Sequence, residues 1–387
     1  MAFTGVSLAN VAAALKVFYL DSLRVQINEK SSIFLAQLER NEEAVVGEKI
    51  VMAMRYGRVG GIGNRADTGT LPEPNPRKTV QASWNTKNLF ARFRITDKSI
   101  EASKTSRGAF VSLLEQELKD CETDMKQDIS RQCMGNTTGL LTTITGIKSG
   151  TTVPVTDTLY LVEGMLVDIW NAADAYVNEK VEILSVNEAA KTITLSAVGT
   201  VANTHEIYVH GNKGLEITGL KSIFEDTTLY NVIRANYPVL NAQRTNVNGN
   251  LSEVTLQKAI DDADRKAGAD SNFMMGSYGV RRAYQALLTA QKQSVNTMEL
   301  KGGWKSLSYN GIAFATDKYV PAGKLFVLDT NDFALYSMGD FNWMDRDGSM
   351  FERVKDKAAW EATMVRYCDI GCQRPKGQVE LYGITEA

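Results

Sequence analysis

The segment YGRVGGIGNRADTGTLPEPNPRK, residues 56–78, limits the possible folds of this chain more than any other stretch. It is rich in glycine at its start and carries Pro72, Pro74 and Pro76 at its end. The β-forming residues of 48–58 and 78–95 on either side predict two strands. An isolated pair of strands is marginally stable in water, so this two-stranded excursion requires a neighbouring surface to lie on.

The same segment contains a pattern typical of dinucleotide-binding loops. Gly61, Gly63 and Ala66 fit the spacing G-x-G-x-x-[GA]. In a nucleotide site, the last of these positions opens a helix whose N-terminus holds the pyrophosphate. Three prolines at alternate positions prevent a helix here. We therefore predict a flexible loop tip and no cofactor.

Composition excludes several functions. The 387 residues include 43 Lys and Arg against 45 Asp and Glu, giving a net charge of -2, which makes a sequence-specific DNA-binding protein improbable. Four scattered cysteines do not make a disulfide framework and fit a reducing cytosol. The apolar N-terminal stretch of residues 6–20 lacks the charge order of a signal peptide, and no stretch is apolar for the length of a membrane span.

Residues 106–134 predict one long helix, because apolar residues recur there at intervals of three or four. We expect Gly135 and Asn136 to end it. Its other faces are mainly acidic. We consider five of these acidic residues candidates for contact between subunits: Glu115, Glu117, Asp120, Glu122 and Asp124.

The remaining chain divides by periodicity. Residues 8–38 predict a helical arm, and residues 142–211 predict a small all-β domain with a hairpin turn at 187–191. Helices are predicted over 251–267, with Ser252 as N-cap and Gly268 as stop, and over 278–288. Short strands follow from residue 301 onward. The predicted class is α+β.

No catalytic or metal site is predicted. His205 and His210, five apart, would point to opposite faces of a strand. The cysteines are spaced C-x3-C and C-x11-C, which is unusual for zinc, so we interpret them as buried small residues. DRDGSMFE at 345–352 lacks the oxygens of a calcium loop, and GSYG at 276–279 is one residue short of a nucleophile elbow. An enzyme would need a site assembled in space.

Charge complementarity within the chain is the remaining signal. Near its tip, the excursion carries five basic residues that are also candidates for contact between subunits: Arg55, Arg58, Arg65, Arg77 and Lys78. If another copy supplies the surface under the excursion, these residues would register it on the acidic helix, although each exposed pair is worth only about 0–1 kcal/mol. The alternative is two independently solvated charged surfaces.

The order of elements resembles the major capsid proteins of tailed bacteriophages with the HK97-type fold. The resemblance is strongest in residues 89–141, from LFARFRITDKS to GNTTGLL, and in residues 307–336, LSYNGIAFATDKYVPAGKLFVLDTNDFALY. It implies a segment for each part of that fold. These are an N-terminal arm (1–46), an extended loop (47–95), a peripheral domain with spine helix (96–141), an inserted β-domain (142–213), an axial domain (214–323) and strands returning to the peripheral domain (324–387).

The resemblance implies a non-enzymatic protein that self-assembles into hexamers and pentamers of an icosahedral head around double-stranded DNA, without sequence-specific DNA binding or membrane contact. Assembly would occur in the cytoplasm of the host bacterium, with a portal and, since the arm begins near Met1, a separate scaffolding protein. Whether a decoration protein binds the β-domain stays open. Neither Lys78 nor Lys87 is marked as a crosslinking residue. Truncating residues 70–75 should impair assembly more than subunit stability. An encapsulin-like compartment is the nearest alternative.

Overall fold

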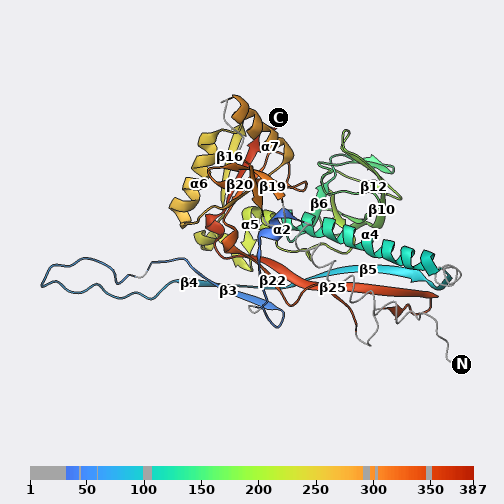
Figure 1. The fold of residues 1–387 in the computed structure, drawn as a ribbon, viewed down its shortest axis with the longest axis horizontal. Helices are drawn as coiled ribbons and strands as arrows, with labels where there is room; N and C mark the ends of the chain where they lie inside the picture. Colours follow the sequence, from blue (N-terminus) through green and yellow to red (C-terminus); the bar gives the residue numbers. More distant parts are fainter. Residues whose placement is uncertain are drawn as a thin grey trace. The chain divides into compact units, whose positions relative to one another are not determined.

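The computed structural model describes residues 32–42, 45–58, 60–98, 107–290, 297–300, 304–345 and 351–387 (Figure 1). Most of the predicted arm over residues 8–38 lies outside these ranges, as do residues 346–350 of DRDGSMFE. The chain forms two compact units. The first contains Lys87–Ile217, Ser337–Asp369 and the described part of Met1–Gln37, and the second contains Leu38–Thr86, Thr218–Tyr336 and Ile370–Ala387.

The first unit is built on the long helix α4 (Arg107–Met134) and the strand β5 (Lys87–Thr96). β5 pairs antiparallel with β25 (Ala359–Cys372), from Lys87 opposite Cys368 to Thr96 opposite Ala359. Helix α4 confirms the helix predicted over residues 106–134, and Met125, Ile129 and Cys133 of its apolar stripe are buried. The smaller elements of this part are α2 (Ile33–Gln37), β23 (Asn342–Trp343) and β24 (Glu352–Arg353).

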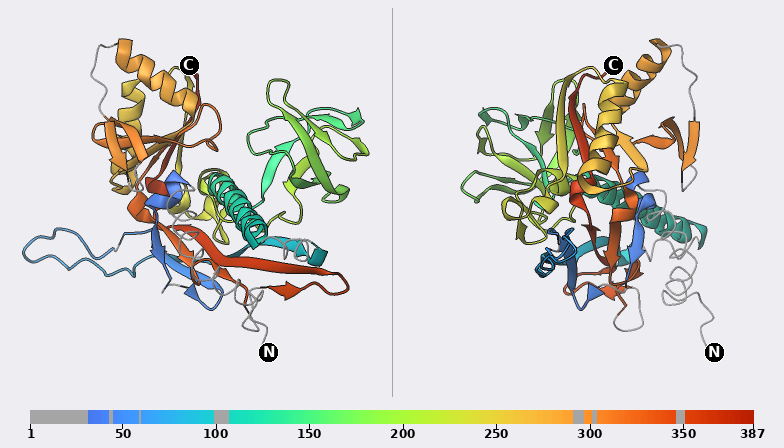
Figure 2. Two further views of the ribbon diagram at one scale, coloured as in Figure 1. Left: turned by 45° about the vertical axis from the view of Figure 1, so that its right-hand side comes forward. Right: turned by 90° about the vertical axis from the view of Figure 1, so that its left-hand side faces the viewer.

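Residues 140–209, also in the first unit, are described throughout and form strands without helices (Figure 2). Six strands make a sheet in the order β6-β13-β9-β10-β11-β8, and β12 pairs with β7. This sheet encloses its own apolar core, which includes Val167, Ile183 and Ile207. The strands are β6 (Leu140–Thr143), β7 (Lys148–Ser149), β8 (Thr152–Pro154), β9 (Leu166–Trp170), β10 (Tyr176–Asn187), β11 (Thr192–Leu195), β12 (Thr200–Val201) and β13 (Glu206–Val209).

The second unit contains a seven-stranded sheet in the order β16-β26-β21-β17-β20-β19-β18. α6 (Glu253–Ala267) and α7 (Tyr278–Ala290) pack on it in one core, and Phe224 of α5 (Leu220–Glu225) stacks on Phe326 of β21. The strands of the sheet are β16 (Gln243–Gly249), β17 (Phe273–Gly276), β18 (Thr297–Leu300), β19 (Trp304–Tyr309), β20 (Ile312–Thr316), β21 (Leu325–Leu328) and β26 (Val379–Ile384).

Both predicted helices of this unit are confirmed. The Ser252 side chain caps α6 by accepting a hydrogen bond from the backbone N–H of Thr255, and Gly268 ends the helix with a φ of 61°. The unit also contains shorter elements, which are β1 (Glu39–Asn41), β2 (Val45–Val46), β14 (Thr228–Leu229), β15 (Val232–Ile233), β22 (Phe333–Ser337) and the 3₁₀ turns η1 (Arg234–Asn236), η2 (Pro238–Leu240), η3 (Thr330–Asp332) and η4 (Pro375–Gly377).

Strand pairing differs from the sequence interpretation in two places. The single strand expected over residues 78–95 is two strands, β4 (Thr79–Asn85) and β5, separated at Thr86. β4 pairs with β3 (Lys49–Arg55) in a hairpin of the second unit, whereas β5 joins β25 in the first. The return segment expected over 324–387 is also divided, because β21 and β26 complete the seven-stranded sheet and only residues 337–369 fall in the first unit.

Candidate functional site

The hairpin β3–β4 is firmly attached at its base. Its strands pair from Lys49 opposite Asn85 to Arg55 opposite Thr79, and alternate residues are buried. Near its base, the Trp84 ring stacks on Tyr230, with ring centroids 4.0 Å apart. The Asn231 side chain donates a 2.6 Å hydrogen bond to the Ser83 carbonyl. The hairpin therefore leaves its unit from a rigid base (Figure 1).

Beyond Arg55, residues 56–78 form an extended tip whose two sides lie next to each other (Figure 1). The glycines of the first side face the second side closely. A Cβ added to Gly60 would lie 2.8 Å from Cβ of Asn75, and one added to Gly61 would lie 3.4 Å from Cα of Pro74. Among the described residues of the tip, no glycine is found with a positive φ. The absence of a side chain on these glycines therefore allows the two sides of the tip to approach each other closely.

The tip is exposed and carries apolar side chains that contact little else in its unit. Ile62 is 65% exposed and Leu71 is 81% exposed. Of the predicted contact residues, Arg58, Arg77 and Lys78 are also exposed. Arg65 is different, because its guanidinium donates hydrogen bonds to the carbonyls of Thr70 and Asn64, each 3.0 Å long, and so braces the turn at the end of the tip.

In the first unit, α4 and β5 form a groove of about 330 Å³, which we call the acidic groove. Its walls combine carboxylates of α4 with apolar side chains of both elements, and Phe90 on β5 is 56% exposed. The lining residues are Leu89, Phe90, Ala91, Arg92, Phe93, Glu117, Asp120, Cys121, Asp124, Met125, Asp128 and Ile129. Three of the five predicted acidic residues meet here. Glu115 and Glu122 also belong to α4, but their side chains lie outside the described part.

The groove has an excess of negative charge. Asp128 is paired with Arg131, and Arg92 is paired with Glu361. Within the described part of the chain, no cation forms an ion pair with Glu117, Asp120 or Asp124. Burial and the nearby Asp120 raise the pKa of Asp124, and burial, Asp124 and Glu117 raise the pKa of the Cys121 thiol to about 11. A basic partner would relieve this crowding of negative charge.

The ends of the 140–209 sheet segment are held to α4 by a buried ion pair that the sequence did not indicate. Arg131, 4% exposed, donates hydrogen bonds of 2.9 and 2.6 Å to Glu216, 2% exposed. Burial lowers the pKa of Arg131, but Asp128 and Glu216 together raise it above its ordinary value. The backbone N–H of Gly214 also donates to the Thr138 carbonyl at 3.0 Å. No motif links residues 85 positions apart, so only the fold reveals this clamp.

The residues considered for catalysis have structural partners. Nδ1 of His210 lies 2.8 Å from Oδ1 of Asp168. Nδ1 of His205 accepts a hydrogen bond from the Ala202 N–H, and the Ser277 hydroxyl donates one to the Glu386 carboxylate. No group of three or more His, Cys, Asp or Glu within the described ranges is placed to bind a metal ion. Nor does any described helix combine the length and apolarity of a membrane crossing.

The described architecture has a fold that occurs in capsid proteins of known structure. No family model matches the sequence, and no curated protein does. The chain aligns with the cyanophage A-1(L) capsid asymmetric unit at a TM-score of 0.56 and 11% identity, covering 90% of this chain and 91% of that one. It aligns with the capsid of a native GTA particle at a TM-score of 0.50 and 9% identity, covering 91% of this chain and 90% of that one. The holo-SrpI encapsulin complex from Synechococcus elongatus PCC 7942 aligns at a TM-score of 0.49 and 9% identity, covering 90% of this chain and 85% of that one. The likeness establishes the fold and confirms the predicted resemblance to phage capsid proteins.

Proposed function

We propose that this chain is a major capsid protein whose copies assemble into hexamers and pentamers of an icosahedral head that encloses double-stranded DNA. The observation that carries the proposal is the exposed tip of residues 56–78 on a rigid hairpin in a chain with a capsid fold. The tip exposes two large apolar side chains, Ile62 at 65% and Leu71 at 81%, on a segment outside the core of its unit. Such exposure is expected of a chain that covers its tip with another copy.

In this proposal, the acidic groove of a neighbouring copy receives the hairpin. Exposed Arg58, Arg77 and Lys78 match the groove carboxylates that have no ion pair among the described residues, and exposed Ile62 of the tip matches exposed Phe90. Charges of opposite sign would register the contact, while apolar burial would supply most of its free energy. Many such modest contacts, repeated by symmetry, would build a closed shell.

The expected parts of the HK97-type fold fit this assignment with revised limits. We assign the extended loop to residues 47–85, the spine helix to α4 and the axial domain to the seven-stranded sheet with α6 and α7. The β-rich segment 142–213 would be the insertion. A net charge of -2 suits a wall that encloses DNA without binding it tightly. A portal and a separate scaffolding protein would complete assembly in the host cytoplasm.

An encapsulin-like compartment is the second candidate, since such shells are built from the same kind of subunit. The two functions differ in their contents. Particles purified from the native source should contain double-stranded DNA if the chain is a phage capsid protein. Protein cargo without DNA would support the compartment instead.

The experiment that tests the proposal shortens both sides of the tip equally. Gly61 and Pro74 lie side by side, so residues 62–73 can be replaced by an Asn-Gly turn. We expect the variant to keep the thermal unfolding of the wild-type subunit and to lose shell formation. The control is Ile147→Ser in a chain with the natural tip, since Ile147 is exposed and lies outside the hairpin. This control should still assemble. Normal shells from the shortened variant would contradict the proposal.

A further inference from the structure

A second recess, of about 510 Å³, lies at the base of the tip, beside the Arg55 end of β3, within the second unit. We call it the base pocket. It gathers residues from the end of β3, η2, the last turn of α6 and η4, and four of its side chains are cationic. The lining residues are Met54, Arg55, Tyr56, Pro238, Val239, Lys266, Ala267, Asp332, Gln373, Arg374 and Lys376.

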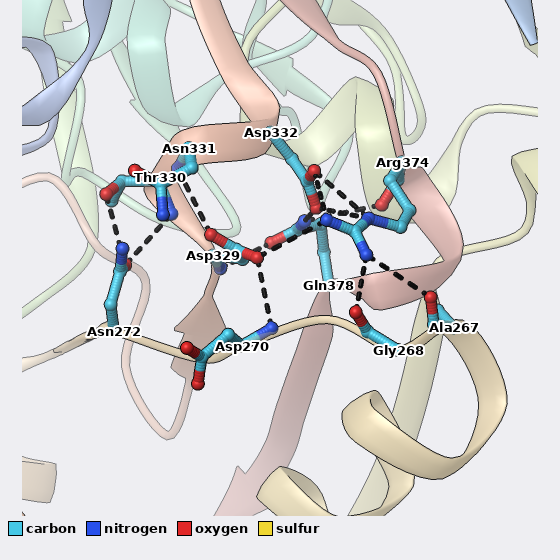
Figure 3. A network of polar contacts seen from close by, with 10 residues as sticks. All are labelled: Ala267, Gly268, Asp270, Asn272, Asp329, Thr330, Asn331, Asp332, Arg374 and Gln378. Atoms are coloured by element: carbon cyan, nitrogen blue, oxygen red, sulfur yellow. Dashed lines mark hydrogen bonds and ion pairs between the residues drawn. The ribbon is translucent and has the colours of Figure 1, made fainter.

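Two of the four cations are neutralised inside the unit. Arg374 holds Asp332 through both carboxylate oxygens and donates further hydrogen bonds to the carbonyls of Ala267 and Gly268 (Figure 3). The Asp332 hydrogen bonds raise the pKa of Arg374, which stays charged. Lys266 pairs with Asp262 at 3.2 Å.

Within the described part of the chain, Arg55 and Lys376 have no carboxylate partner. Arg55 donates a 3.1 Å hydrogen bond to the Gly57 carbonyl. The remaining walls, including Met54, Pro238 and Val239, are largely apolar. A pocket of this kind suits a carboxylate that is flanked by apolar groups, because a bare phosphate backbone would leave the apolar walls unused.

The tip of this same chain carries that chemistry in Leu71-Pro72-Glu73-Pro74. Leu71 and Glu73 are exposed, and the flanking prolines favour an extended segment that loses little entropy on binding. Its own pocket is out of reach. Glu73 lies beside Gly61. Gly61 is six residues from Arg55 along the extended side of the tip, so Glu73 is about 20 Å from Arg55 at ~3.3 Å per residue.

We propose that the base pocket of one copy binds the Leu71–Pro74 segment of a second copy, with Glu73 between Arg55 and Lys376. The contact would be head to tail, so the tip of each subunit would occupy the base pocket of the next. It rests on the proposed function, because it requires copies to assemble. It adds an acidic contact to a hairpin on which the exposed candidates Arg58, Arg77 and Lys78 are basic.

Charge exchange tests the pairing. Glu73→Lys and Lys376→Glu should each raise the critical concentration for assembly about fivefold, as expected for the loss of a solvent-accessible ion pair. The double exchange should return it to within about twofold of the wild type. Glu188→Lys and Lys355→Glu, at exposed positions elsewhere, are the matched controls and should assemble normally.

Disulfide trapping provides a second test that does not depend on charge. In preassembled shells, the variant with Glu73→Cys and Lys376→Cys should form covalent multimers on oxidation, whereas each single variant should stay monomeric on non-reducing gels. Shells without these multimers and without rescue by the double exchange would overturn the pairing and leave the proposed function intact. Failure of the wild-type chain to assemble both alone and together with its scaffolding protein would refute the proposed function itself.

Discussion

Replacing Leu71 by serine should separate assembly from folding. The side chain is 81% exposed, so the free energy of unfolding of the isolated subunit should change by no more than about 0.5 kcal/mol. Complete burial of a leucine is worth about 1.5–3 kcal/mol. If most of this side chain becomes buried against a neighbour, the variant loses about 1.5–2 kcal/mol per subunit, which raises the critical concentration for assembly by ~10–30-fold.

The assay is static light scattering across a concentration series, with urea unfolding of the unassembled subunit measured in parallel. Ile147→Ser is the matched control, because Ile147 is 74% exposed on the β-rich segment and lies outside the hairpin. Coincident assembly curves for Leu71→Ser and the wild type would refute the reasoning. A large loss of subunit stability would do so as well, because it would place Leu71 in the core.

Three further predictions concern the isolated subunit. Glu216→Gln leaves the buried Arg131 with one carboxylate and should lower the free energy of unfolding by roughly 2–4 kcal/mol, whereas Asp128→Asn, at a partly exposed partner, should cost less than about 1 kcal/mol in urea titrations. The reverse ranking would contradict the clamp. Cys121, with its pKa raised to about 11, should react with iodoacetamide at pH 8 about 100-fold more slowly than a thiol of pKa 9.0, and Asp124→Asn should accelerate it. An unchanged rate in that variant would exclude the carboxylate as a cause. Ser252→Ala should destabilise the subunit by about 1 kcal/mol through loss of the α6 cap, and an unchanged thermal midpoint would argue against that cap.

Periodicity and capping predicted most elements because both act over a few residues. The stripe of α4 is an example, since Met125, Ile129 and Cys133 lie on one face and are buried together. The Ser252 cap and the Gly268 stop are equally local. The short strands predicted from residue 301 onward include β21 and β26, where apolar runs are bounded by turns.

Strand partners and buried ion pairs were not predictable, because they depend on residues far apart in sequence. The sequence predicts one strand over residues 78–95. The structure has two strands there, because β4 pairs with β3 and β5 pairs with β25. Arg131 and Glu216 carry no local signal, and neither do Arg374 and Asp332. The basic candidates were correctly placed on an exposed hairpin, but Arg65 braces its own turn and Arg55 belongs to the base pocket.

Electron microscopy of the purified chain, expressed alone and together with a candidate scaffolding protein, tests the central claim most directly. We predict shells, or rings of five and six subunits, in at least one of the two preparations. A monodisperse particle of one or two subunits in both preparations would contradict the assignment as a capsid protein.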